Sequence, residues 1–189
     1  MRYRNSWALL GTVLALAICP LRAQEDEEVR RHPGYVDFSS LPIPSEGEET
    51  VEVYLRAPLL RLVAKAASED SALAGMLSKL LLIRVNTFSI DTAMALALQP
   101  KIAKIESELA KKAWEKVVRV KDRKGETAHV YLKLQDTKIL GLLVMAVEPG
   151  GEAAFVNIVG EIDMQAIGKL GKKLDIPALE GVSTPKRSK

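Results

Sequence analysis

Three acidic residues near the end of the chain have types and spacing that acid–base chemistry could use. Glu161 and Asp163 stand two positions apart and would share one face of a strand, and Glu152 precedes them in the same segment. Paired carboxyl groups carry out hydrolysis when their environments separate their pKa values. We interpret Asp163 instead as the cap of a helix and Glu161 as a solvent-facing side chain, because no further catalytic group accompanies them.

The two histidines, His32 and His129, are far apart in the sequence, and neither has a second histidine or a cysteine beside it. A metal site needs three or four converging ligands. We expect His129 to be a solvated residue on the polar side of a strand and His32 to belong to a docking segment. The sequence therefore predicts no metal site.

Motifs for nucleophiles and phosphate binding are also missing. The sequence has no Gly-x-Ser-x-Gly elbow and no Ser-x-x-Lys pattern before a helix in a β–α context. No glycine-rich stretch leads into Gly-Lys-Ser or Gly-Lys-Thr. We therefore predict no catalytic residue and no cofactor, and we expect a protein that is not an enzyme.

Residues 1–23 have the layout of a cleavable secretory signal peptide, with a cationic start and an apolar stretch from Trp7 to Cys19. This stretch is shorter than the about 20 residues that a membrane span needs. We expect cleavage after Ala23 and export to the periplasm or cell envelope. Lipid attachment at Cys19 is an alternative, although the neighbouring residues fit a lipoprotein cleavage box poorly.

Cleavage would also change the charge of the chain. The sequence has 27 basic and 24 acidic residues, and removing residues 1–23 leaves 24 of each. A neutral surface with interspersed charges is not typical of proteins that bind nucleic acid or lie on membranes. The single cysteine, Cys19, would leave with the signal, so the mature chain would have no disulfide and would depend on its hydrophobic core.

Hydrophobic periodicity predicts the elements that position these residues. Residues 24–50 are expected to form an extended, largely flexible lead, within which Tyr35 and Phe38 could dock onto the folded body. Residues 51–174 are expected to form the domain, and residues 175–189 a polar tail.

Within the domain we predict the order β-α-α-β-α-β-β-β-β-α. A helix should start near Pro58, and Asp91 should cap a long helix that Pro100 would kink or break. The remaining patterns predict strands at residues 51–56, 82–90, 116–121, 127–134, 138–147 and 153–162. The fold class is therefore α+β, a single two-layer domain of mostly antiparallel sheet with helices on one face.

Asn157 looks out of place, because it interrupts a β-branched strand between Val156 and Ile158. A buried amide must find hydrogen-bond partners, so the structural interpretation is a bond to a neighbouring strand or turn. The functional interpretation is an interaction face of Tyr131, Phe155 and Asn157, opposite the helices. Its aromatic and amide content is typical of interfaces.

Several segments of the chain resemble one known family. They are His32–Phe38, Trp114–Val120, Val130–Lys133, Gly141–Val144 and Phe155–Asp163. Together they are similar to the domain of unknown function 4252 family of exported bacterial proteins, over roughly residues 32–178. The resemblance implies no activity, cofactor or catalytic residue. It implies a small envelope protein encoded near extracytoplasmic sigma factors and their antagonists, and hence a signalling or surface-stress context.

These observations lead to three hypotheses of function. The first is an exported, non-enzymatic module that binds an envelope protein or a second copy of itself, with no nucleic acid and no stable membrane span once the signal is removed. The second is a carrier for a small apolar ligand, which needs a pocket of several hundred Å³ between sheet and helices. The third is a hydrolase that uses Glu152, Glu161 or Asp163.

Overall fold

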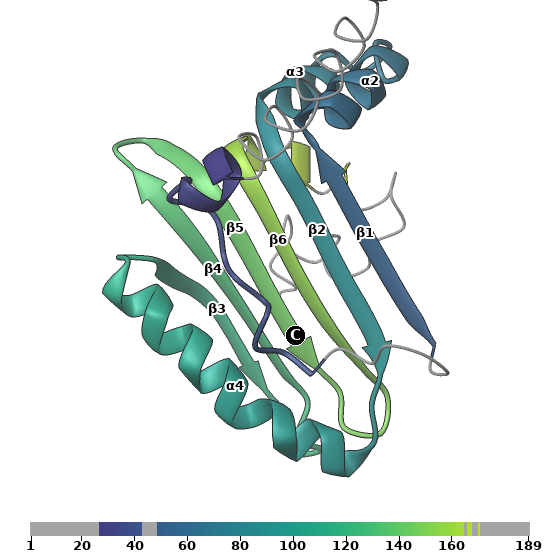
Figure 1. Ribbon diagram of the computed structural model, residues 1–189, viewed down its shortest axis with the longest axis vertical. Coiled ribbons are helices and arrows are strands. Elements are labelled where there is room, and N and C mark those ends of the chain that lie inside the picture. Colours follow the sequence, from purple (N-terminus) through teal and green to yellow (C-terminus); the bar gives the residue numbers. More distant parts are fainter. Residues whose placement is uncertain (1–26, 43–48, 165, 168–169, 171–189) are drawn as a thin grey trace, which may run out of the picture.

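The computed structural model describes residues 27–42, 49–164, 166–167 and 170. The predicted signal peptide, the polar tail and the end of the last predicted helix lie outside the described residues. The described part folds around one antiparallel sheet of six strands (Figure 1). The α+β class that we predicted is confirmed.

The elements lie close to the segments expected from the sequence. The strands are β1 (Thr50–Arg56), β2 (Leu80–Ser89), β3 (Glu115–Lys121), β4 (Thr127–Gln135), β5 (Lys138–Val147) and β6 (Glu152–Ile162). The helices are α2 (Ala57–Ala66), α3 (Ser71–Lys79) and α4 (Thr92–Lys111). In the sheet, the strands follow the order β1-β2-β6-β5-β4-β3, so β1 and β3 form its two edges. Residues 27–31 form a further helical turn, which the expectation of an extended lead missed.

Side chains of the central strands alternate between two buried faces, as the pleat of a strand requires. On β5, Leu142 and Val144 enter a hydrophobic cluster that α2 and α3 complete. Their neighbours Leu143 and Met145 enter a second cluster, which contains the apolar side of α4. The long helix therefore lies on one face, while α2 and α3 pack at one end of the sheet, around the opposite face.

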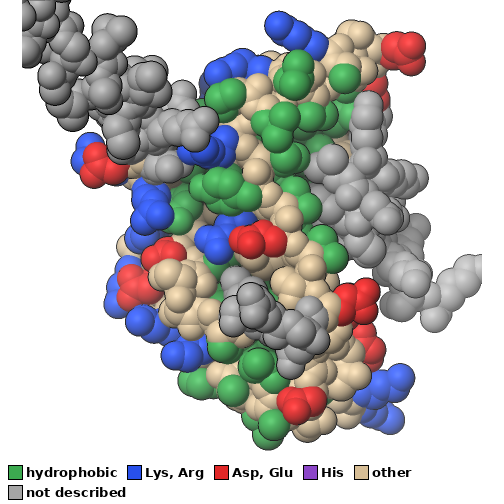
Figure 2. Space-filling view, turned by 45° about the vertical axis from the view of Figure 1, so that its right-hand side comes forward, with side chains coloured by type: hydrophobic (Ala, Val, Ile, Leu, Met, Phe, Trp, Pro, Cys, Tyr) green, Lys and Arg blue, Asp and Glu red, His purple; other side chains and the backbone are tan. Residues whose placement is uncertain are grey.

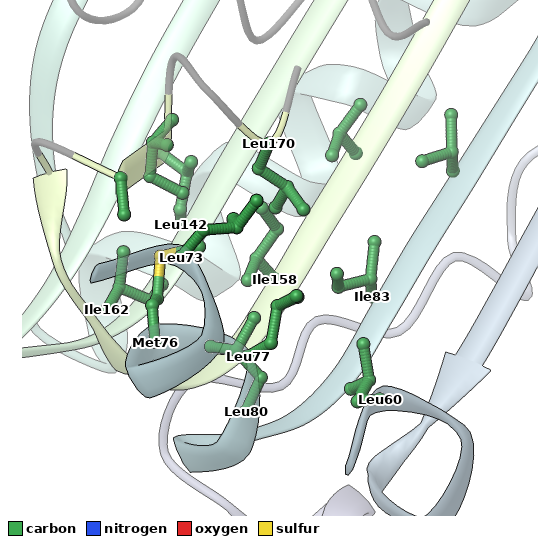
Figure 3. Close-up of a cluster of buried hydrophobic side chains, with 14 of the residues drawn as sticks. Leu60, Leu73, Met76, Leu77, Leu80, Ile83, Leu142, Ile158, Ile162 and Leu170 are labelled. Atoms are coloured by element: carbon green, nitrogen blue, oxygen red, sulfur yellow. The ribbon is translucent and has the colours of Figure 1, made fainter. Parts of the chain in front are cut away.

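The first of these clusters forms where α3 meets the sheet. Figure 3 shows Leu73, Met76 and Leu77 of α3 directed toward Ile158 and Ile162 of β6. The outer side of this helical pair remains accessible, since α2 exposes Leu59 and Leu62. Figure 2 shows hydrophobic side chains gathered at the end of the molecule that carries α2 and α3.

Helix α4 begins at the predicted cap, where the Asp91 side chain accepts a hydrogen bond from the Met94 amide at 2.6 Å. The helix continues through Pro100 to Lys111, so the predicted break does not occur. A proline removes the bond to the carbonyl group four residues earlier. That carbonyl belongs to Leu96, which lies on the exposed side of the helix, where water can replace the lost bond.

The end of α4 turns the chain sharply into β3. Ala113 has a φ of 52°, and its amide donates to the carbonyl of Ala110, while the Trp114 amide donates to the carbonyl of Leu109. These two bonds form a Schellman motif, which normally has glycine at the left-handed position. The turn directs Trp114 into the core beneath the helix.

The lead packs across the face that α4 also covers (Figure 1). A Cβ atom on Gly34 would stand 2.0 Å from the carbonyl oxygen of Leu140, and one on Gly141 would stand 2.6 Å from the Gly34 Cα. Glycine at both positions permits this close approach of two backbones. Phe38 is fully buried, with its ring 6.0 Å from that of Phe155. The docking expected of Phe38 is therefore confirmed.

Candidate functional site

Strand β3 is an edge of the sheet and is accessible along its whole length. It pairs with β4 on one side, and all seven of its residues are exposed. Val117, Val118 and Val120 keep between 41% and 50% of their surface open to solvent. An edge strand presents a row of backbone N–H and C=O groups that another strand can pair with. This edge therefore combines backbone groups with accessible apolar side chains.

The two faces of β3 differ in character. Val118, like its partner Val130, lies on the face away from α4, and Val120 follows it two residues later. The register shifts between Lys116 and Val118, which leaves Val117 as the extra residue of a bulge. The face toward α4 carries the basic side chains Lys116, Arg119 and Lys121.

Glu106 of α4 connects the helix to this edge. Its Oε1 atom accepts hydrogen bonds from the Tyr131 hydroxyl at 2.5 Å and from Lys116 Nζ at 2.9 Å. His129 Nδ1 lies 2.5 Å from the same oxygen, and the His129 side chain is only 12% exposed. The expectation of a solvated His129 is therefore wrong, because α4 covers this part of the strand.

Hydrogen bonds keep the carboxyl group of Glu106 ionised. Burial alone would raise the pKa of Glu106, but the bonds from Tyr131, Lys116 and His129 hold it at about 2. Burial and the bond to Glu106 raise the pKa of Tyr131. A carboxylate with so low a pKa is a weak proton acceptor near neutral pH. Glu106 therefore acts as a clamp between α4 and the β3–β4 hairpin.

A groove of about 430 Å³ lies between α4 and the β3–β4 hairpin, and Glu106, His129, Arg119 and Lys121 contribute to its lining. Glu106 is already paired with Lys116, whereas Arg119 and Lys121 have no ion-pair partner among the described residues. The groove and the neighbouring edge are consequently positive. An acidic group is the ligand that this surface would attract.

Tyr131, Phe155 and Asn157 do share one face of the sheet, as predicted, but that face is buried. Their exposed fractions are 4%, 0% and 0%. They lie beneath α4 and the lead, so the prediction of an interaction face opposite the helices is wrong. Strand periodicity shows which side chains point the same way, but it does not show what covers them.

The structural interpretation of Asn157 is confirmed. Its Oδ1 atom accepts a hydrogen bond from the Val36 amide at 3.0 Å. Its Nδ2 group donates to the carbonyl of Gly34 at 3.0 Å and to that of Leu142 on β5 at 3.2 Å. One side chain thus joins the lead to the middle of the sheet, and the buried amide leaves none of these three backbone groups unpaired.

Of the acidic residues considered for hydrolysis, Glu161 and Asp163 line one groove at the end of β6, and Glu152 lies apart from them. Glu161 accepts hydrogen bonds from Lys138 at 2.7 Å and Lys79 at 2.8 Å, which hold its pKa at about 2. Glu152 lies at the other end of β6 from Glu161, about 30 Å away at the usual rise of a strand. Asp163 directly follows β6. Glu152 therefore cannot act together with Glu161, and the low pKa of Glu161 makes it a weak proton acceptor beside Asp163.

His32 is half-buried, and burial lowers its pKa. Its Nδ1 atom accepts a hydrogen bond from the Gly34 amide at 3.1 Å, so the ring supports the turn that leads into the docked segment. In the described part of the chain, no three His, Cys, Asp or Glu side chains are grouped closely enough to hold a metal ion. Among the described helices, none is both long and apolar enough to cross a membrane.

Sequence reasoning did not single out Glu106. Its position in the sequence could have indicated its location, because Glu106 follows Ile102 by four residues and precedes Leu109 by three. Residues at these spacings are neighbours on a helix, so Glu106 borders the apolar stripe that meets the sheet. An acidic residue at that border can reach a polar group on the strand beneath it.

The family model described as Domain of unknown function (DUF4252) matches residues 45–170, which is more than half of the chain. The chain belongs to this family. The matched range covers all six strands and the helices between them, and it confirms the resemblance of the segments from Trp114 onward. The segment His32–Phe38 precedes the matched range. No curated protein and no solved structure is significantly similar to the chain.

Proposed function

We propose that the protein is an exported, non-enzymatic module that binds a protein partner by taking up an extended segment of it at the β3 edge. The observation that carries this proposal is the exposure of all seven β3 residues, which leaves three valines accessible beside unpaired backbone groups. In strand addition the main-chain hydrogen bonds provide affinity, and alternate side chains provide specificity.

The two faces of β3 define the chemistry of the segment that fits. Apolar side chains of the partner would contact Val118 and Val120, while acidic side chains would contact Lys116, Arg119 and Lys121. Each favourable cross-strand pair contributes about 0.2–1 kcal/mol. A segment that alternates acidic and apolar residues is therefore the preferred partner. The bulge at Val117 interrupts the ladder, so the regular part of the pairing begins at Val118.

The proposed location outside the cytoplasm rests on the signal-peptide pattern of residues 1–23. The resemblance to exported envelope proteins adds the context of surface signalling. Its test is the mass of the protein recovered from the envelope fraction of its host. We expect a chain that starts at Gln24, and a full-length chain that stays in the cytoplasm would contradict the proposal.

An apolar ligand carrier receives less support. The groove between the lead and α4 has a volume of about 250 Å³, and charged side chains line it. These charged residues are Asp37, Lys104, Glu108 and Lys112. An apolar ligand would have to desolvate these charges without compensating contacts. The same objection applies to the groove beside β3, where Glu106, Arg119 and Lys121 form part of the wall.

The binding proposal is tested by cross-linking in the host. A photoreactive amino acid replaces Val120 on the β3 edge, and in a matched control it replaces Lys101, an exposed residue of α4. We expect the Val120 probe to form a protein adduct that the Lys101 probe does not form. Absence of any adduct from the Val120 probe, in a folded and exported protein, would refute binding at this edge.

A further inference from the structure

The second edge of the sheet, β1, has the pattern that β3 is expected to bind. Val53 pairs with Val85 and belongs to the apolar cluster on the face away from α4. Glu52 pairs with Asn86 and lies on the opposite face, together with Tyr54. Val51 is 54% exposed and Tyr54 is 48% exposed. β1 is therefore an accessible edge with valines on one face and an acid and an aromatic ring on the other.

The sheet topology makes the two edges compatible in direction. All five strand pairs are antiparallel, and β1 and β3 are the first and last of six strands, so they run in opposite directions. If a second copy lies beside the first with its β1 next to β3, the new pair is also antiparallel. The faces agree as well, because Val53 and Val118 both lie on the face away from α4.

We infer that the partner strand of β3 is β1 of a second copy of this chain. This inference rests on the function proposed above and names its partner. A register with Arg119 opposite Glu52 also places Val118 opposite Val53 and Val120 opposite Val51. Beyond the bulge the same register brings Lys116 to Tyr54, where a cation meets the face of an aromatic ring. Each of these four positions is thus apolar against apolar, or cationic against an acid or a ring, while Lys121 comes to lie opposite Thr50 at the end of the pair.

The charges select this arrangement over the pairing of two β3 strands. If β3 paired with β3 of another copy with the same faces together, Arg119 would lie opposite Arg119 or opposite Lys121. Like charges directly opposite one another destabilise a sheet. The cations on β3 and the acid on β1 therefore disfavour pairing of two β3 edges and favour pairing of β3 with β1.

Pairing β1 with β3 is a heterologous contact, because two different surfaces of the chain meet. Such a contact leaves one free β1 and one free β3 at the ends of every open assembly. Further copies can therefore add until the rotation closes a ring, or they continue as a filament. The strands of a sheet rotate by about 20–25° each. Successive copies in a continuous sheet would therefore turn by roughly 120–150° and form a helical chain of molecules.

The test is sedimentation velocity of the purified protein over about 1 µM to 1 mM at low salt. We expect the mean mass to rise with concentration without stopping at a dimer. Arg119→Glu and Glu52→Lys are each expected to weaken association about tenfold, and the double charge reversal to restore it. Glu52→Gln keeps an acceptor for Asn86 and serves as the milder variant. Lys101→Glu is the control, since it makes the same change of charge on α4.

A protein that stays monomeric over this range would overturn the inference. So would Arg119→Glu and Glu52→Gln variants that associate no more weakly than Lys101→Glu, or a double reversal that restores nothing. A peptide of alternating glutamate and valine separates this failure from failure of the proposed function. If a monomeric protein binds the peptide and Arg119→Glu abolishes the binding, the β3 edge remains a binding site, but its partner is another protein.

Discussion

Replacement of Asn157 by alanine is expected to release the lead from the sheet. The Asn157 amide pairs with three buried backbone groups, which are the Val36 N–H and the carbonyls of Gly34 and Leu142. Alanine offers none of these bonds. Two of the three groups belong to the lead, so the structure can relieve the loss only if the lead moves away and water reaches them.

The loss of stability depends on whether the lead stays in place with unpaired groups or moves away from the sheet. Each backbone group left buried and unpaired costs about 1–3 kcal/mol. The loss of stability cannot exceed the cost of detaching the lead. Detachment exposes Val36, Phe38 and Leu41, whose burial contributes about 1.5–3 kcal/mol each. Ordering the segment costs about 1–2 kcal/mol per residue and offsets part of that gain. We therefore expect Asn157→Ala to lower the free energy of unfolding by about 2–4 kcal/mol.

The assay combines urea unfolding, followed by circular dichroism, with hydrogen exchange of the lead. Asn86→Ala is the matched control, because Asn86 is also a fully buried asparagine but, among the described residues, its side chain bonds to the side chains of Arg84 and Glu52 and to no backbone group. These long side chains can turn toward water, so the control should cost about 1 kcal/mol. Equal losses in the two variants, with unchanged protection of the Val36 amide, would refute this account of the lead.

Three further predictions concern the clamp, the end of α4 and the contact of two glycines. The pKa of Glu106 falls from 4.5 to about 2 on folding, so its contribution to stability is present above pH 4.5 and is lost as the pH falls toward 2. Between pH 6 and pH 2.5 the wild type should therefore lose about 1–2 kcal/mol more than Glu106→Gln in urea titrations, after allowance for solvent screening; equal losses would contradict the clamp. Ala113→Gly should raise the free energy of unfolding by about 1 kcal/mol, since Ala113 has a φ of 52°; a lower melting temperature would contradict this. Gly141→Ala should lower it by about 2–4 kcal/mol, because the new Cβ would stand 2.6 Å from the Gly34 Cα. Gly75→Ala is the control, because nothing lies within 4 Å of the added atom, and it should leave stability unchanged or raise it. Similar losses of stability in both variants would show that the lead does not lie against Gly141.

The elements of the fold could be predicted because their signals are local. Strand β5 is apolar along most of its length, which is typical of a central strand, and Asp91 stands where a helix cap is needed. The break expected at Pro100 did not occur, because α4 packs its apolar side against the sheet both before and after Pro100 and this burial offsets the cost of the proline. The first two of these outcomes depend on a few neighbouring residues, whereas the third depends on tertiary packing.

The candidate site was less accessible to sequence reasoning. The pattern of β3 is visible in the sequence as alternating valines and cations, but only the strand order shows that β3 is an edge. Tyr131, Phe155 and Asn157 were correctly placed on one face and wrongly placed in solvent. Their cover comes from α4 and from the lead, and contacts between such distant segments leave no periodic signal.

By itself the sequence determined the class of the domain, the succession of its strands and helices, and the need of a buried asparagine for partners. These follow from periodicity, propensity and the cost of an unpaired amide. Only the tertiary structure decided that Asn157 holds the lead, that Glu106 meets His129 and Tyr131, and that β1 and β3 are the open edges. The physical reason is that burial and pairing are properties of the assembled sheet, because they depend on which segments, remote along the chain, come to lie on each strand.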